Sequence, residues 1–425
     1  MLQEPRLTSA VRRRRPGRIA RIALALAVLA IVARLATQFA LGFFDHPVTW
    51  EYQDLAVNLV RGNGYVIEHN GTNFHAFSLP LYPFLLAATY EIFGVTPVGA
   101  ALLHMALGAA LTLVVFDLTR RVGGMLAATV AGALVATHPG LLVFSAEVHS
   151  LSLDALLPVL GVLLLVQIRA SLRIRGAVVL GLVTGAMALD RPTALVFMVL
   201  GFALTFVTTP RARGAAGPVL LWIAVALVIP GMWVTRNALL LGEPVLTTTG
   251  AEVLWVGNNP DSTGGALRED GTPVLDGSEM EARTWGRSEL VQERLFSAAT
   301  SAYILADPLR AVRGDLAKER DYWWPSSRVG IEYPAPWVRV YLLYYAAILA
   351  LATLGLVVLA RKRLWRISAT YVLAFLTISL GQSLIYVEGR HRWEIEPLLL
   401  SLAGVGAAAI NQVVARAAQA RRGTT

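Results

Sequence analysis

Glu51 and Asp54 are two acidic residues three positions apart, a spacing at which both carboxyl groups could act in one site. Residues three apart on a helix share one face. The pair, with Tyr52 between its members, could therefore supply a general base or ligands for a divalent metal ion. The alternative is that both carboxylates lie on the solvated face of a helix at a membrane surface and have no functional role.

Other ionisable residues lie beside apolar segments, where burial is costly and a functional role is the first hypothesis. Glu147 and His149 stand in a short connection and could face the same site as Glu51, or only cap a neighbouring segment. Asp190 precedes Arg191 at the tip of an apolar hairpin, where the two could form a self-neutralising turn. The whole set comprises Arg34, Glu51, Asp54, Glu147, His149, Asp154, Asp190, Arg191, Arg236, Glu388, Arg390, His391, Arg392 and Glu394.

The composition excludes several classes of chemistry. Cysteine is absent, which removes disulfides, thiol nucleophiles and thiolate metal ligands. The sequence contains no Walker loop, no dinucleotide-binding fingerprint and no HExxH motif. The formal net charge is +9, but the basic residues cluster in short runs between apolar stretches, which indicates membrane topology and no nucleic-acid partner. All but two of the 37 basic residues are Arg, which suggests a GC-rich bacterial genome.

Long apolar stretches must position these polar residues, and they predict an all-α polytopic membrane protein. Mean hydropathy is +0.58 and 56% of the residues are hydrophobic, values outside the range of ordinary soluble domains. A membrane-spanning helix needs about 20 apolar residues, and on this basis we expect about ten spans. They fall at 22–43, 97–117, 124–142, 151–168, 176–190, 193–209, 218–235, 338–360, 368–387 and 394–413.

Basic runs at alternate ends of these segments predict the orientation of the chain, because arginine and lysine favour the cytoplasmic side. All of the runs fall on one side of the ten-span arrangement. Both chain ends are therefore expected in the cytoplasm, with the protein in the cytoplasmic (inner) membrane and membrane lipids as its surroundings. The runs lie at 12–15, 120–121, 169–175, 211–213, 361–366 and 416–422.

The apolar stretch 81–93 is too short to span a bilayer. Counting it as a span would also place Arg120-Arg121 outside and invert every later basic run. We expect instead a helix in the outer interface, with Tyr82 as an interfacial anchor. Residues 44–96 would then be one external loop, with two short interfacial helices joined by the turn Gly62-Asn63-Gly64.

A second external segment, 237–337, is about a hundred residues long, which is uncommon for a loop unless it is functional or disordered. Its helix-compatible stretch 278–320 and the aromatic run Tyr322-Trp323-Trp324 predict that part of it folds and rests on the membrane surface. The predicted organisation is a transmembrane module over 1–236, this external loop, and a second module with a cytoplasmic tail over 338–425.

Short motifs of the chain resemble, in the right order, those of the GT-C glycosyltransferases. The most similar branch contains the dolichyl-phosphate-mannose-protein mannosyltransferases and the lipid A aminoarabinose transferase. The resemblance extends over roughly residues 20–410. The motifs are Glu51 to Leu59, Gly62 to Tyr65, Leu79 to Pro83, Ala188 to Pro192, Trp233 to Asn237, Gly257 to Pro260, and Gly389 to Arg392.

The resemblance implies an enzyme that moves a sugar from a polyprenyl-phosphate donor to a lipid, glycan or protein acceptor at the external membrane face. Its usual catalytic element is a carboxylate of the first external loop. Val48-Thr49-Trp50 stands where the family's Asp is expected, so the base stays open among Asp45, Glu51 and Asp54, and a divalent metal ion stays an option. The catalytic candidates are Glu51, Asp54 and Glu147, and the substrate-binding candidates are Arg191, Arg236, Arg390, Arg392, Tyr82 and His149.

Two other functional classes compete with this interpretation. A lipid or glycolipid transporter or flippase would be favoured by inverted repeats with broken helices at matching places in two halves. The sequence shows no such symmetry, and the long external segment is unusual for a transporter. A non-catalytic subunit of an envelope-assembly complex is the third alternative, because a shared fold does not by itself imply activity.

Overall fold

The computed structural model describes residues 16–168, 172–208, 216–324 and 335–422. These ranges are mainly helical, and the predicted all-α polytopic membrane fold is confirmed. Five described helices are long and apolar enough to cross a membrane. The ten expected spans all coincide with helices, while the count of ten remains a prediction. These helices are α1 (Pro16–Ala40), α4 (Pro97–Ala136), α6 (Leu151–Gln167), α7 (Ile174–Ala188), α8 (Pro192–Thr208), α9 (Ala216–Leu241), α14 (Ala335–Arg361), α15 (Trp365–Ser383) and α17 (Glu396–Arg422).

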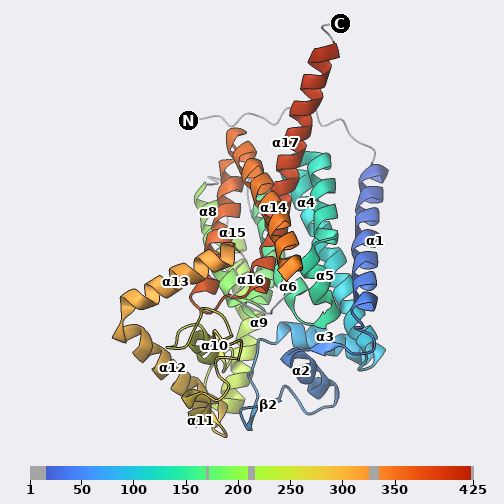
Figure 1. The fold of residues 1–425 in the computed structure, drawn as a ribbon. Coiled ribbons are helices and arrows are strands. Elements are labelled where there is room, and N and C mark those ends of the chain that lie inside the picture. Colours follow the sequence, from blue (N-terminus) through green and yellow to red (C-terminus); the bar gives the residue numbers. More distant parts are fainter. Residues whose placement is uncertain (1–15, 169–171, 209–215, 325–334, 423–425) are drawn as a thin grey trace.

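Helix α4 contains two of the expected spans. Gly124 interrupts it with φ 85° and ψ −174°, a backbone conformation that essentially only glycine adopts without strain. The two halves run side by side as a hairpin (Figure 1). Just before the turn, Asp117 accepts hydrogen bonds from Arg120 at 2.5 Å and from Arg121 at 2.7 Å. This basic turn lies at the same end of the bundle as the last turns of α14 and α17 (Figure 1).

The basic runs at 12–15 and 211–213, and Arg169, lie outside the described residues. The opposite end of the bundle carries the connecting segments that hold the candidate residues (Figure 1), and we call it the loop end.

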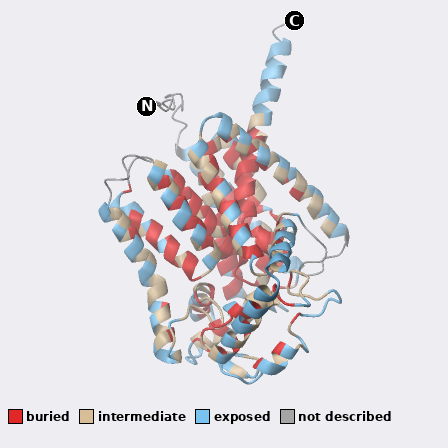
Figure 2. Cartoon of the chain, turned by 90° about the vertical axis from the view of Figure 1, so that its left-hand side faces the viewer, coloured by how far each residue is buried: buried red, intermediate tan, exposed pale blue. Residues whose placement is uncertain are grey.

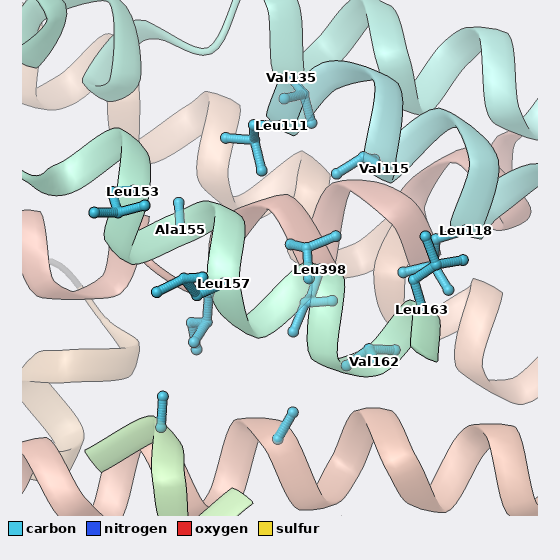
Figure 3. Close-up of a cluster of buried hydrophobic side chains, with 14 of the residues drawn as sticks. Leu111, Val115, Leu118, Val135, Leu153, Ala155, Leu157, Val162, Leu163 and Leu398 are labelled. Atoms are coloured by element: carbon cyan, nitrogen blue, oxygen red, sulfur yellow. The ribbon is translucent and has the colours of Figure 1, made fainter. Parts of the chain in front are cut away.

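The apolar core runs through the middle of the bundle, with exposed residues around its rim (Figure 2). Side chains of α4, α6 and α17 interlock there, among them Leu111, Leu157 and Leu398 (Figure 3). Small residues let the helix backbones approach closely, as is common within membranes. A Cβ at Gly406 of α17 would lie 2.2 Å from a backbone oxygen of α14, and one at Gly404 would lie 2.4 Å from a backbone oxygen of α4.

The first segment at the loop end contains the two short helices expected from the sequence. These are α2 (Glu51–Val60) and α3 (Leu81–Phe93), and α3 lies across the ends of the long helices (Figure 1). The link between them is more than a turn, because β2 (Ile67–His69) and β3 (Thr72–Phe74) form an antiparallel hairpin. The turn of this hairpin is Asn70-Gly71, whose φ values are 47° and 72°.

The second large segment folds into four helices over its described residues: α10 (Gly250–Val256), α11 (Glu279–Thr284), α12 (Glu289–Ala306) and α13 (Pro308–Trp323). It packs against the first segment through Glu289, whose buried carboxylate accepts hydrogen bonds from the backbone N–H groups of His75 and Ala76 and from the hydroxyl of Thr248. Lys318 of α13, also buried, donates to the backbone oxygens of Gly257 and Ile385. The segment is therefore fixed to both modules.

Candidate active site

Two short strands bring separate connections of the loop end together. Strand β1 (Val48–Thr49) pairs in parallel with β4 (Glu147–Val148), which follows α5 (Pro139–Val143) and the short helix η1 (Phe144–Ala146). The indole Nε1 of Trp50 donates a hydrogen bond of 2.8 Å to Glu147 Oε2. This ladder fixes the residue that precedes α2, and therefore the place where α2 begins.

Glu51 is the first residue of α2 and is partly buried. Burial raises the pKa of its carboxyl group, while a backbone hydrogen bond and the positive charges of Arg390 and Arg191 act in the opposite direction. Burial likewise raises the pKa of Glu147. Two carboxyl groups of elevated basicity thus lie beside the β1–β4 ladder.

Asp54, one turn further along α2, is exposed. The two members of the acidic pair therefore sit in different environments. Among the described residues, no three acidic or imidazole groups converge in a way that could hold a metal ion. The two donors considered from the sequence, Glu51 and Asp54, are thus not joined by a third ligand among the described residues.

Arg191 reaches the site from the tip between α7 and α8. Its Nη2 and Nε atoms donate to one oxygen, Oδ2, of the buried Asp154, at 2.8 and 3.1 Å. Asp154 stands in the first turn of α6 and is only 1% exposed. The remaining guanidinium nitrogen, Nη1, makes no hydrogen bond to the described residues. Arg191 therefore has a fixed plane and an unused donor.

Arg390 reaches the site from α16 (Gly389–Trp393). Its guanidinium carbon lies 4.6 Å from the ring centroid of Trp50, and it forms an ion pair with Glu388. Its buried Nε has no hydrogen-bond partner among the described residues. Glu388 also caps the N-terminus of α16, in a capping box with His391. The second arginine is thus also held in place with one donor unused.

His149 and Tyr82 pack against Tyr52 of α2. His149 is buried, with its ring 5.1 Å from that of Trp50 and 5.6 Å from that of Tyr52. Burial and the nearby arginines lower its pKa, so the ring is neutral, and its Nδ1 accepts the N–H of Leu151. The hydroxyl of Tyr82 is bonded to His104 at 2.7 Å. Both side chains pack beneath α2 and hold Tyr52 in place.

The other two candidate arginines are held by partners of their own. Arg236 of α9 stacks over Trp233 and donates to the backbone oxygens of His75 and Tyr65, so it fastens the first segment of the loop end to α9. Arg392 is 1% exposed, and all three of its nitrogens are bonded: Nε to Glu396, Nη1 to the oxygen of Tyr322, and Nη2 to the hydroxyl of Tyr341.

Three residues of the site have no specific task in the sequence interpretation: Asp154 and Glu394, which stand out there only as charges beside apolar spans, and Trp50. Trp50 looks like an ordinary interfacial aromatic in sequence, but it contacts both Glu147 and Arg390. Glu394 is 1% exposed and neither of its carboxyl oxygens has a partner in the described structure. The signal available from sequence was charge beside an apolar span, which marks such residues without saying what they bind.

The comparisons with known proteins agree with this architecture. Residues 75–233 match the family model of the dolichyl-phosphate-mannose-protein mannosyltransferases. The sequence has no significant match among curated proteins.

Among solved structures, the archaeal oligosaccharyltransferase AglB from Archaeoglobus fulgidus, in complex with an inhibitory peptide and a dolichol-phosphate, aligns with a TM-score of 0.56 at 13% identity. The alignment covers 95% of this chain but only 52% of AglB, so the chain spans about half the length of that relative.

ArnT from Cupriavidus metallidurans also matches, in the form bound to undecaprenyl phosphate and in the apo state. Both alignments have TM-scores of 0.40, with 14% and 16% identity. They cover 94% and 91% of this chain, and 79% and 77% of ArnT. The fold assignment rests on the alignment with AglB. The chain is a multi-pass membrane protein with the GT-C fold, and its residues 75–233 match the dolichyl-phosphate-mannose-protein mannosyltransferase family.

Proposed function

We propose that the protein is a glycosyltransferase that moves a sugar from a polyprenyl-phosphate donor to an acceptor hydroxyl at the external face of the cytoplasmic membrane. The observation that carries the proposal is the position of Glu51. It follows Trp50, on which Arg390 lies, and the charges of Arg390 and Arg191 act on its carboxyl group. Each of the two arginines keeps a nitrogen without a hydrogen-bond partner among the described residues. The family match and the dolichol-phosphate of AglB support the class of donor.

The proposed reaction uses the carboxylate and the two arginines for opposite tasks. Glu51, made more basic by burial, accepts the proton of the acceptor hydroxyl as its oxygen attacks the anomeric carbon. The bond from that carbon to the phosphate oxygen breaks, and its electron pair stays with the phosphate. Arg191 Nη1 and Arg390 Nε stabilise the leaving anion, because fixed guanidinium groups suit phosphate oxygens. Glu147 lies beside Glu51 across the ladder and is the second acidic group of the proposed site.

The remaining candidates take supporting places in the proposal. Arg236 holds the first segment of the loop end over the site rather than contacting the phosphate. Arg392 is not assigned to the phosphate, because each of its three nitrogens already donates to a protein partner and the side chain is buried. Tyr82 and His149 keep Tyr52 and the start of α2 in position.

Changing Glu51 to Gln keeps the shape of the side chain and removes the base, so turnover is expected to fall about 10²–10⁴-fold with normal expression in the membrane. The measurement is sugar transfer from a synthetic polyprenyl-phosphate sugar in washed, reconstituted vesicles. Mass spectrometry of envelope glycans from a deletion strain supplies the acceptor. Asp54→Asn is the matched control and is expected to be near normal, because Asp54 is exposed.

If turnover is near normal in Glu51→Gln but lost in Asp45→Asn or Asp54→Asn, the residue whose change abolishes turnover is the base. Activity that survives all three changes would overturn the mechanism. Lipid translocation without sugar transfer would support the flippase alternative instead.

A further inference from the structure

Helix α16, which carries Arg390, is too short to fix its own position. It contains only the five residues Gly389–Trp393, and isolated helices shorter than about 12–15 residues are marginal in water. The residue before it, Glu388, is its N-cap and forms an ion pair with Arg390. The placement of Arg390 on Trp50 therefore depends on what holds the connection that leads from α15 to Glu388.

This connection, residues 384–387, is held by the second segment of the loop end. The side-chain Nδ2 of Asn258 donates to the backbone oxygen of Leu384 at 3.0 Å and to that of Ile385 at 3.3 Å. A Cβ at Gly257 would lie 1.8 Å from the oxygen of Ile385, so the connection leaves no space for a side chain at position 257. The backbones of the two segments are thus in direct contact.

Lys318 of α13 joins the same two backbones from a third side, and it is only 2% exposed. Its Nζ donates to Asn258 Oδ1 at 3.0 Å and to the backbone oxygen of Ile385 at 3.1 Å. A further bond of 3.3 Å reaches the oxygen of Gly257, and Asp315 forms an ion pair with the ammonium group at 2.9 Å. Hydrogen bonds from a charged donor are stronger than neutral ones, so this buried contact is costly to break.

A second fastening lies directly before the cap of α16. The buried Val387 donates its N–H to the backbone oxygen of Gly264 at 2.8 Å. Gly264 in turn packs on the stem of Lys318, because a Cβ at this glycine would lie 3.0 Å from Lys318 Cγ. Val387 is the neighbour of Glu388, so the contacts continue from α13 through the connection to the residue that pairs with Arg390.

We infer that Lys318 and Asn258 form a latch by which the second segment positions Arg390 for the phosphate of the donor. The two are positioning residues, because they act on Arg390 only through the connection and its cap. The inference rests on the proposed function, in which Arg390 Nε stabilises the leaving phosphate. Arg191, the other arginine of the proposed site, is held by Asp154 and not by the latch. Loss of the latch should therefore remove the contribution of Arg390 and leave that of Arg191 intact.

Hydrogen exchange of the full chain in nanodiscs tests the latch itself. Lys318→Met keeps an apolar stem and removes the bonds of Nζ, so amides of residues 384–393 should exchange about tenfold faster, while those of the α4 turn stay unchanged. Asn258→Ala, which removes the side-chain bonds to the connection, should have the same local effect. Arg313→Met, at an exposed basic residue of the same helix, is the matched control and should change nothing. Unchanged exchange at 384–393 in both latch variants would overturn the latch.

Binding of undecaprenyl phosphate, used as the probe, tests whether the latch acts on Arg390. Lys318→Met and Arg390→Lys should each weaken binding about tenfold, and the double variant should be no more than about tenfold weaker than the parent, because a displaced Arg390 has nothing further to lose. Lys318→Met combined with Arg191→Lys should instead approach about a hundredfold, because these changes act on separate arginines. Asn258→Ala takes the place of Lys318→Met in both cycles if the latter does not reach the membrane.

The positioning role and the proposed function fail in different experiments. If the losses from Lys318→Met and Arg390→Lys multiply, or if Lys318→Met couples equally to both arginines, the latch only stabilises the fold and the positioning role is wrong. If exchange at 384–393 rises as expected while the parent chain does not bind the probe, the latch stands as a contact and the proposed function fails.

Discussion

Arg390 and Arg392 are separated by one residue, yet their side chains enter different environments. Arg390 lies on Trp50, next to Glu51, with an unpartnered Nε. Arg392 points into a buried network with Glu396 and Tyr341, and its guanidinium also lies 4.4 Å from the ring centroid of Tyr345. The first has the features of a binding residue, and the second those of a residue that joins helices.

Conservative changes at these two positions should therefore have opposite effects. Arg392→Lys keeps the charge but loses the bonds to Tyr322 and Tyr341, and a cost of about 1–3 kcal/mol in stability is expected, as for buried groups left without a hydrogen bond. Arg390→Lys should leave stability near normal and raise the KM for the lipid donor about tenfold, because an ammonium group lacks the planar fork. Thermal unfolding measures the effect on stability, and titration with the lipid donor measures the effect on KM. If Arg390→Lys destabilised the protein and Arg392→Lys raised the KM, the roles assigned to the two residues would be wrong.

The residue types of the site could be found from sequence, but their partners could not. Glu51 stands out because it begins a short helix directly behind an apolar span. Whether Arg191 binds Asp190, its neighbour, or Asp154, in another helix, depends on how α6 packs beside the α7–α8 tip. Sequence spacing does not contain that information, and it gives no reason to separate Arg390 from Arg392.

At the scale of elements, the β2–β3 hairpin is the main feature that the sequence interpretation missed. A local signal exists, because Asn-Gly between extended residues is typical of a two-residue hairpin turn. The turn also docks: Asn70 donates to Gln292 of α12, and His69 contacts Glu252 of α10. By contrast, the helix α3 was predicted with its bounds, because an apolar run too short for a span is a strong pattern. Its place in the outer interface remains a prediction.

Helix α13 carries an apolar stripe that the protein leaves uncovered. Leu305 at the end of α12 and Leu309, Val312 and Leu316 of α13 are 76%, 69%, 54% and 65% exposed. Their spacing places them along one helical face. The last turns of α13 are fixed to the end of α15, because Glu319 accepts hydrogen bonds of 2.7 Å from both Ser379 and Ser383. The helix thus extends sideways from the bundle near the ends of its spans (Figure 1).

We expect this stripe to lie in the outer lipid leaflet, because an apolar helical face at the membrane interface is buried among acyl chains. The absence of native cysteines makes a clean test simple. Single cysteines at Leu309 and Val312 should resist a membrane-impermeant maleimide in vesicles, whereas Ala317→Cys, on another exposed side of α13, should react readily. Equal labelling at the three positions would place the stripe in water or against a partner.

At the scale of the whole molecule, length and hydropathy were enough to predict the helical bundle. Each apolar segment is long, and the signal for a span is local. The assembly of the loop end is different, because its ladder joins residues 48–49 to 147–148 and its arginines come from positions 191 and 390. These contacts link distant parts of the chain, so no local pattern determines them.

The predicted orientation can be tested on the intact chain. Reporter fusions after Arg121 should score cytoplasmic and those after Gly265 external, because the basic α4 turn is expected to stay inside. A fusion at Arg121 that scored external would make 81–93 a span. It would also put the candidate site on the wrong side of the membrane for the proposed reaction.

The β1–β4 ladder and the contact of Arg390 with Trp50 also determine when the site can exist during protein synthesis. Glu51 leaves the ribosome early, but its β4 neighbour follows roughly a hundred residues later and Arg390 roughly 340 residues later, about 20–70 s at ordinary translation rates. For about the first third of that time Trp50 has neither Glu147 nor Arg390 beside it, and for the rest it lacks Arg390. Arg191 and Asp154 are made close together in time and can pair as their helices enter the bilayer. The proposed site therefore cannot be complete until α16 has been made.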